Sequence, residues 1–224
     1  MIEALDGCRR VLNVGAGAAS YEPHDRYVTA VEPSSVMIAQ RPVGAAPVIR
    51  GVAQALPIGD KSFDAAMAVL TIHHWMDIES GLSELTRVAR KRIAILTWDP
   101  AHPGFWLDRY FPEILDIDRP LFPAIAMLEQ HLGLCKSVVV PIPHDCTDGF
   151  LGAYWRRPEA YLRADVRAAI STFSRLSDIE TGLSKLRADL AAGHWRQRNG
   201  HLVQLHQLDL GYRLLIFHDF DNPQ

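Results

Sequence analysis

Five short apolar segments in the first hundred residues constrain the fold more than any other feature of the sequence. Each is nearly continuous in apolar and β-branched residues, which is typical of strands that are buried on both faces. Between the fourth and fifth segments, apolar residues recur at helical spacing and cations occupy the last turn. Strands that alternate with helices in this way predict an open α/β sheet. The predicted strands are residues 10–14, 27–32, 47–51, 63–71 and 92–98, and the predicted helix is 78–90.

The pattern changes after about residue 100, where helical segments predominate and strands become rare. A capping-box pattern at Ser177–Glu180 opens one of the predicted helices, Pro158 begins another, and glycines end two of them. A sixth strand is expected at 137–142 and a last one at 212–218. We therefore divide the chain into an α/β core at 1–100, helices and a sixth strand that complete the core at 101–143, a helical cap at 144–210, and a last strand with its tail at 211–224.

Composition and charge narrow the possible partners and the compartment. The net charge is −3, so the chain lacks the basic surplus that a nucleic-acid binder needs. The three cysteines show no CxxC spacing, which suits a reducing compartment. No apolar run reaches the ~18–20 residues that span a bilayer, and the first residues do not resemble a signal peptide. We expect a cytoplasmic protein that binds neither nucleic acid nor membranes, as a monomer or a homodimer.

A glycine turn and a distant carboxylate together predict a nucleoside-containing ligand. Gly15 and Gly17 follow the first strand, where glycine lets the backbone approach a ligand closely and a following helix would offer free N–H groups. Glu32 ends the second strand and can accept both hydroxyls of a ribose. Either a dinucleotide or S-adenosylmethionine fits this pair. The third glycine of a dinucleotide motif is replaced by Ser20, and Pro23 limits a helix there, so S-adenosylmethionine is favoured.

Four motifs carry a resemblance to a known family. They are VLNVGAG at 11–17, AVEPSSVM at 30–37, GVAQALPIGDKSFD at 51–64 and AVLTIHHW at 68–75. Together they resemble the class I S-adenosylmethionine-dependent methyltransferases, specifically the type 11 small-molecule group. The stretch 141–162 resembles the C-terminal part of one bacterial branch of that group, whose members are often assigned to antibiotic or secondary metabolism.

The resemblance implies a Rossmann-like sheet of seven strands, the last of them antiparallel. The cap stands between the sixth and the last strand, at the edge where open α/β sheets bind ligands, so we expect it over the substrate site. It also implies that S-adenosylmethionine is the cofactor and S-adenosylhomocysteine the product. Asn13 stands where the family usually has an acid, so the charge attraction to the cofactor's ammonium group is lost. The implied cofactor-binding residues are Asn13, Gly15, Ala16, Gly17, Glu32, Pro33, Met37, Ala53, Gln54, Leu70 and Thr71.

Candidate catalytic and substrate residues follow the strands at the same edge of the sheet. His73 and His74 come after the fourth strand, and His144 after the sixth; each either contacts the acceptor, as a base for example, or is structural. The run His144–Cys146 matches no zinc spacing, and we expect no metal. Aromatic side chains that could wall the substrate pocket, or pack in a core, are Trp75, Trp98, Tyr154 and Trp155.

The sequence therefore predicts an enzyme that transfers a methyl group from S-adenosylmethionine to a small organic acceptor, and the resemblance suggests an acceptor from secondary metabolism. Two alternatives stay open. One is a nicotinamide-dependent Rossmann oxidoreductase, and the other is a non-catalytic relative that binds S-adenosylmethionine.

Overall fold

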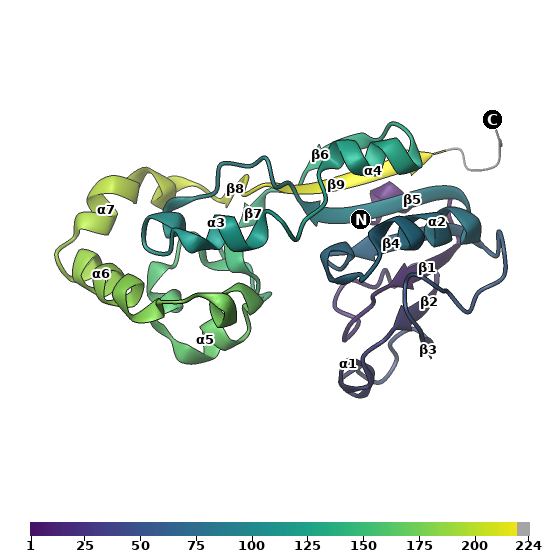
Figure 1. Cartoon of the computed structure of the whole chain (residues 1–224), viewed down its shortest axis with the longest axis horizontal. Coiled ribbons are helices and arrows are strands. Elements are labelled where there is room, and N and C mark those ends of the chain that lie inside the picture. Colours follow the sequence, from purple (N-terminus) through teal and green to yellow (C-terminus); the bar gives the residue numbers. More distant parts are fainter. Residues whose placement is uncertain (219–224) are drawn as a thin grey trace. The chain divides into compact units, whose positions relative to one another are not determined.

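The computed structural model describes residues 1–218, and the chain divides into two compact units (Figure 1). The first unit comprises Met1–Asp99, Phe122–Val138 and the described chain from Arg213 onward. The second comprises Pro100–Leu121 and Val139–Tyr212. The two units are therefore built from interleaved stretches of one chain, and each has its own core.

A seven-stranded sheet forms the centre of the first unit, which confirms the predicted α/β fold. The pairs β1–β2, β1–β4, β2–β3 and β4–β5 are all parallel, and Figure 1 shows β9 running in the opposite direction to β5. Nearly all side chains of β1 and β4 are buried, as their continuous apolar runs predict. In spatial order the strands are β3 (Val48–Arg50), β2 (Tyr27–Glu32), β1 (Arg10–Val14), β4 (Phe63–Val69), β5 (Ala89–Trp98), β9 (Tyr212–His218) and β6 (Lys136–Val139).

Two helices, α2 (Ile78–Val88) and α4 (Ile125–Leu132), cover one face of this sheet. Leu82, Leu85 and Leu128 are fully buried there against strand residues such as Leu12 and Leu215. Asp77 begins α2 by accepting a hydrogen bond from the Ser80 backbone N–H at 3.0 Å, which satisfies one of the unpaired amides of the first turn.

Short elements take the place of long helices elsewhere in this unit. They are the 3₁₀ turns η1 (Glu3–Leu5) and η2 (Ile72–His74) and the five-residue helix α1 (Ser35–Ala39). Residues 15–26 form turns, so the helix end expected beyond the glycine turn is absent. Pro23 lies in this segment and is buried; its missing N–H and fixed φ disfavour a helix.

The second unit is a set of short helices around an aromatic core. The indole N–H of Trp106 donates to the Trp155 carbonyl at 2.6 Å, and the Trp155 indole donates to the Ile142 carbonyl at 3.0 Å. Trp106 also meets the rings of Tyr161 and Trp195 edge-on. The elements are η3 (Trp106–Arg109), α3 (Glu113–Asp118), β7 (Ile142–Pro143), η4 (Leu151–Tyr154), η5 (Pro158–Leu162), α5 (Ala164–Ala168), η6 (Ser171–Arg175), α6 (Ile179–Ala191), α7 (His194–Asn199), η7 (Gly200–Gln204) and β8 (Gln207–Leu208).

The structure corrects several predicted boundaries. Residues 100–121 belong to the second unit and do not complete the α/β core, because their aromatic side chains pack with that unit. The predicted strand 137–142 is two strands of different sheets, separated at Pro141, which has no N–H to donate. Pro158 opens a 3₁₀ turn instead of an α-helix. Asp178, and not Ser177, caps α6, because the Ser177 hydroxyl and N–H are bound by Glu113.

Candidate functional site

The glycine turn lies where β1 and β4 end, and it is tightly packed. Gly15 and Gly17 have φ values of 71° and 52°, in the left-handed region that favours glycine. A Cβ atom on Gly15 would lie 2.0 Å from the Thr71 Oγ1 atom, so no larger residue fits unless Thr71 moves. The N–H groups of Gly15 and Ala16 both donate to the Val31 carbonyl, at 2.8 and 3.1 Å, which fixes the turn against β2.

Glu32 is buried beside this turn, with 6% of its surface exposed. Its Oε2 atom accepts a hydrogen bond from the Gly17 N–H at 2.8 Å, and its Oε1 atom accepts one from the Ser34 N–H at 2.9 Å. A carboxylate oxygen can accept about two hydrogen bonds, so each oxygen keeps one acceptor position. The carboxylate is therefore held in place by the backbone and can still receive two hydroxyl donors.

Two features beside Glu32 are typical of a ligand site. Asn13 is 2% exposed, and its Oδ1 atom has no hydrogen-bond partner among the described residues. Buried polar atoms are normally paired, so this oxygen is available to a donor from a ligand. Leu70 has a φ of 50°, a strained backbone conformation for a bulky residue and one that is found preferentially at functional sites. Thr71 follows it and is buried against the turn.

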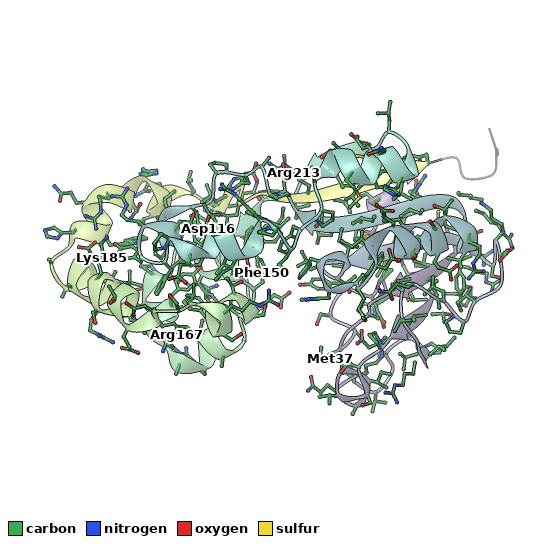
Figure 2. All side chains as sticks on the ribbon, in the orientation of Figure 1. Met37, Asp116, Phe150, Arg167, Lys185 and Arg213 are labelled. Carbon is green, nitrogen blue, oxygen red and sulfur yellow. The ribbon has the colours of Figure 1, made fainter. Side chains whose placement is uncertain are left out.

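The other predicted cofactor residues lie around the ends of β2 and β3. Met37, labelled in Figure 2, is on α1, and its Cε atom would lie 3.5 Å from a Cβ on Gly17. Pro33 is exposed and its carbonyl accepts from Arg50 at 3.3 Å. Ala53 is buried in the core. With its amide oxygen assigned to the side that faces the β4–α2 loop, Gln54 accepts from the N–H groups of Met76 and Asp77 at 2.7 and 3.1 Å.

A buried ion pair supports the turn from outside, and the sequence analysis missed it. Arg41 and Glu22 approach within 2.6 Å, with 5% of each side chain exposed. Arg41 also donates to the Gly17 carbonyl at 3.2 Å, and the Ala46 N–H donates to Glu22 at 2.9 Å. A loop stands where a helix is normally expected after the turn, and these bonds hold that loop in position.

Aromatic rings cluster after β4 and β5. The His73 ring lies on Phe122 with centroids 4.1 Å apart and on His74 at 3.9 Å, and Trp98 meets Phe122 edge-on at 5.5 Å. His74 is exposed and His73 half-buried. The structure thus brings His73, His74 and Trp98 together through Phe122, a residue that no local pattern in the sequence singled out.

Other predicted substrate residues lie elsewhere. Trp75 packs on the first turn of α2, where a Cβ on Gly81 would lie 2.4 Å from its ring, so it is bound to the core. Trp155 is fully buried in the core of the second unit, which corrects its assignment to a pocket wall. Tyr154 is half-buried under Arg157, and the His144 N–H donates to the His206 carbonyl at 3.0 Å. His74 belongs to the first unit and His144 to the second, and contact of either with the acceptor stays a prediction.

Two features are absent from residues 1–218. This part of the chain contains no group of three or more His, Cys, Asp or Glu side chains placed to hold a metal ion. It also contains no helix with the length and apolar character that crossing a membrane requires.

The chain is similar to known methyltransferases. A methyltransferase domain family matches residues 4–95. A solved structure from Anabaena variabilis, described as a methyltransferase of an antibiotic biosynthesis pathway, is 34% identical, with a TM-score of 0.85 over 93% of this chain and 90% of that one. The YcgJ protein of Bacillus subtilis shares the fold, with a TM-score of 0.53 at 17% identity over 98% of this chain and 99% of that one.

Curated relatives match only a part of the chain. A chloroplastic 2-methyl-6-phytyl-1,4-hydroquinone methyltransferase of rice is 33% identical over 67 residues, or 30% of this chain. That match covers 19% of the rice protein, so the chain spans about a fifth of the length of this relative.

Proposed function

The chain belongs to the class I S-adenosylmethionine-dependent methyltransferases of the type 11 group, and on that premise we propose that it transfers a methyl group from S-adenosylmethionine to a small organic acceptor. The observation that carries this proposal is the carboxylate of Glu32, buried and held by the Gly17 and Ser34 N–H groups. A carboxylate fixed in this way at the end of a second strand is suited to the two hydroxyls of a ribose.

The residues of the turn fit S-adenosylmethionine. Glu32 would accept hydrogen bonds from the ribose hydroxyls through the one free acceptor position on each oxygen. The unpaired Oδ1 atom of Asn13 would accept a hydrogen bond from the ammonium group of the methionine part. The left-handed glycines would let the backbone lie close to the same part of the molecule. When bound, S-adenosylmethionine supplies a methyl group already activated on a positively charged sulfur.

The protein would then have to orient the acceptor and exclude water. The rings of His73, Phe122 and Trp98 offer an apolar surface after β4 and β5, near the buried Thr71. For a hydroxyl acceptor, His73 or His74 would take the proton at an imidazole nitrogen. These roles, and those of His144 and Tyr154 in the second unit, remain proposals.

Similarity over nearly the whole chain supports an acceptor from secondary metabolism. The Anabaena protein covers both units of this chain and is described as belonging to an antibiotic biosynthesis pathway. A cytoplasmic location, a monomeric or homodimeric state, and the lack of a nucleic-acid partner stay predictions from the sequence.

Titration calorimetry tests the cofactor. We expect saturable binding of S-adenosylhomocysteine and none of NAD. Glu32→Gln should weaken S-adenosylhomocysteine binding at least about tenfold, because a hydrogen bond to a charged group contributes about 1.5–3 kcal/mol. Glu3→Gln is the matched control, since Glu3 is exposed in the same unit. Tight NAD binding without S-adenosylhomocysteine binding would favour the oxidoreductase alternative.

Methyl transfer from labelled S-adenosylmethionine to a panel of small phenols, amines and thiols separates an enzyme from a non-catalytic binder. We expect labelled product with at least one class of acceptor. Binding of S-adenosylhomocysteine with no transfer to any class would favour the non-catalytic relative.

A further inference from the structure

A second cleft opens at the end of the sheet that the methyltransferase site does not use. It has a volume of about 630 Å³ and is lined by residues 7–9 and 24–27, all in the first unit. Arg10 and Tyr27 are the first residues of β1 and β2 and are paired across those strands. Glu32 and the glycine turn follow the last residues of the same strands. The two sites therefore lie at opposite ends of β1 and β2.

Positive charge gathers around this cleft, although the chain as a whole has a net charge of −3. Arg9 and Arg26 line it, and the cations of β5 lie close by. The pKa of Asp64 is held below its ordinary value first by the backbone N–H groups of Arg10 and Arg9, at 3.0 and 2.9 Å, and further by the charges of Lys91 and Arg90. The cations of β5 thus act on a carboxylate that the backbone beside the cleft also binds.

The acidic groups near the cleft, Asp6, Asp25 and Asp64, already accept hydrogen bonds. Asp6 accepts one from the Gly7 N–H at 3.0 Å. Asp25 forms two hydrogen bonds of 2.9 Å with Arg26, which also donates to the Cys8 carbonyl at 3.4 Å and to the Ile2 carbonyl at 3.3 Å. Asp64 accepts the two backbone N–H groups described above. Within residues 1–218, by contrast, the exposed guanidinium of Arg9 makes no hydrogen bond or ion pair. Arg9 is therefore the cation that a bound anion could reach.

An aromatic surface adjoins this cation. Tyr27 lines the cleft and is 71% exposed at the start of β2. His24 lines the cleft as well and is exposed. A guanidinium binds phosphate oxygens through two parallel N–H groups, and a tyrosine ring packs well on another flat ring. The lining thus combines a phosphate-binding group with a stacking surface.

We propose that this cleft is a second ligand site, which binds a small phosphate monoester carrying a planar ring. The phosphate would contact Arg9 and His24, and the ring would lie on Tyr27. The ligand would bind together with the cofactor, because no residue of the cleft belongs to the turn or to the Glu32 environment.

The test is a calorimetric titration of the whole protein with phenyl phosphate, with and without saturating S-adenosylhomocysteine. We expect saturable binding with a dissociation constant below about 1 mM at low salt in both cases. Arg9→Ala should weaken it at least about tenfold, the loss of one charge-assisted contact. Arg196→Ala, an exposed arginine of the second unit, is the matched control and should change nothing.

A second variant separates the two parts of the ligand. Tyr27→Ala should weaken the binding of phenyl phosphate at least about threefold and leave the binding of inorganic phosphate unchanged, because only the ring contact is lost. Both positions are exposed, so the variants should melt like the parent protein, which circular dichroism checks. The proposal is overturned by a lack of saturable binding, by equal weakening in Arg9→Ala and Arg196→Ala, or by displacement of phenyl phosphate by S-adenosylhomocysteine.

Discussion

Replacing Gly15 with alanine tests the packing of the cofactor turn most directly. Gly15 has a φ of 71°, and a Cβ there would lie 2.0 Å from the Oγ1 atom and 2.8 Å from the Cβ and Cγ2 atoms of Thr71. Real Cβ atoms essentially never approach heavy atoms below 3.0 Å, so either Thr71 or the turn must move. The substitution therefore carries two separate costs, one from the backbone conformation and one from the contact.

Both costs can be given a size. A left-handed conformation costs a residue with a side chain about 1–2 kcal/mol. An extra methyl group forced into a packed site costs about 1–3 kcal/mol. Gly15→Ala should therefore destabilise the protein by about 2–5 kcal/mol. Gly7→Ala is the matched control, because Gly7 has a φ of 74° but nothing lies within 4 Å of a Cβ atom placed there. It should cost only about 1–2 kcal/mol, the amount from the backbone conformation.

Urea denaturation of four variants measures the two costs. Thr71→Ala removes the Oγ1 and Cγ2 contacts and leaves the contact of 2.8 Å with Cβ. Combined with Gly15→Ala, it should restore at least about 1 kcal/mol of the free energy of unfolding, as an interaction energy between the two positions. Equal losses in Gly15→Ala and Gly7→Ala, with no interaction between positions 15 and 71, would refute the close approach of the turn to Thr71.

Three further predictions concern buried polar groups. Glu22→Gln should lower the free energy of unfolding by about 3–5 kcal/mol, because it leaves the buried Arg41 without its partner; a loss in urea denaturation below about 1 kcal/mol would contradict the buried pair. Burial raises the pKa of Asp108 to about 6, so its charged form destabilises the folded state and its contribution improves as the pH falls from about 6 toward 4. Asp108→Asn should therefore be more stable than the parent by about 1–3 kcal/mol at pH 8 and lose this advantage near pH 4; an advantage independent of pH in thermal melts would be inconsistent with the shifted pKa. Trp106→Phe leaves the Trp155 carbonyl unpaired and should cost about 1–3 kcal/mol in urea, whereas an unchanged midpoint would mean that this bond contributes nothing.

The sheet could be predicted from sequence because its strands are locally encoded. The segments 10–14, 27–32 and 212–218 were predicted with the bounds that the structure has, and each consists mostly of apolar residues. The seven-stranded fold followed from the motifs and is confirmed. Burial on both faces leaves such segments few alternatives to a strand.

The second unit was harder to predict because packing decides its short elements. The sequence predicts one helix that begins at Pro158 and carries apolar residues at helical spacing, but the structure has η5, α5 and η6 in succession. Tyr161 and Phe173 are buried from separate elements and meet with centroids 6.3 Å apart. Tertiary contacts between large rings thus override a helical period of apolar residues.

The site shows the same division between local and distant signals. Glu32 and the glycine turn were found because both stand at strand ends with a recognisable spacing. Phe122 and the Glu22–Arg41 pair were missed, since their partners lie far away in the sequence and no local pattern marks them. Charged residues in a segment without periodicity are predicted to be exposed, and only the folded structure shows that this pair is buried.

The place of β9 in the sheet determines when the sheet can be completed during synthesis. This strand lies between β5 and β6, yet it comes later in the chain than every other described strand. While the ribosome is still making residues 140–211, β6 has no neighbour to pair with, and the edge of β5 is open to water or to other nascent chains. The sheet can close only when residues 212–218 have left the exit tunnel and entered a gap between two strands made long before. A chaperone that covers apolar strand edges would therefore be needed most in the interval before residues 212–218 emerge.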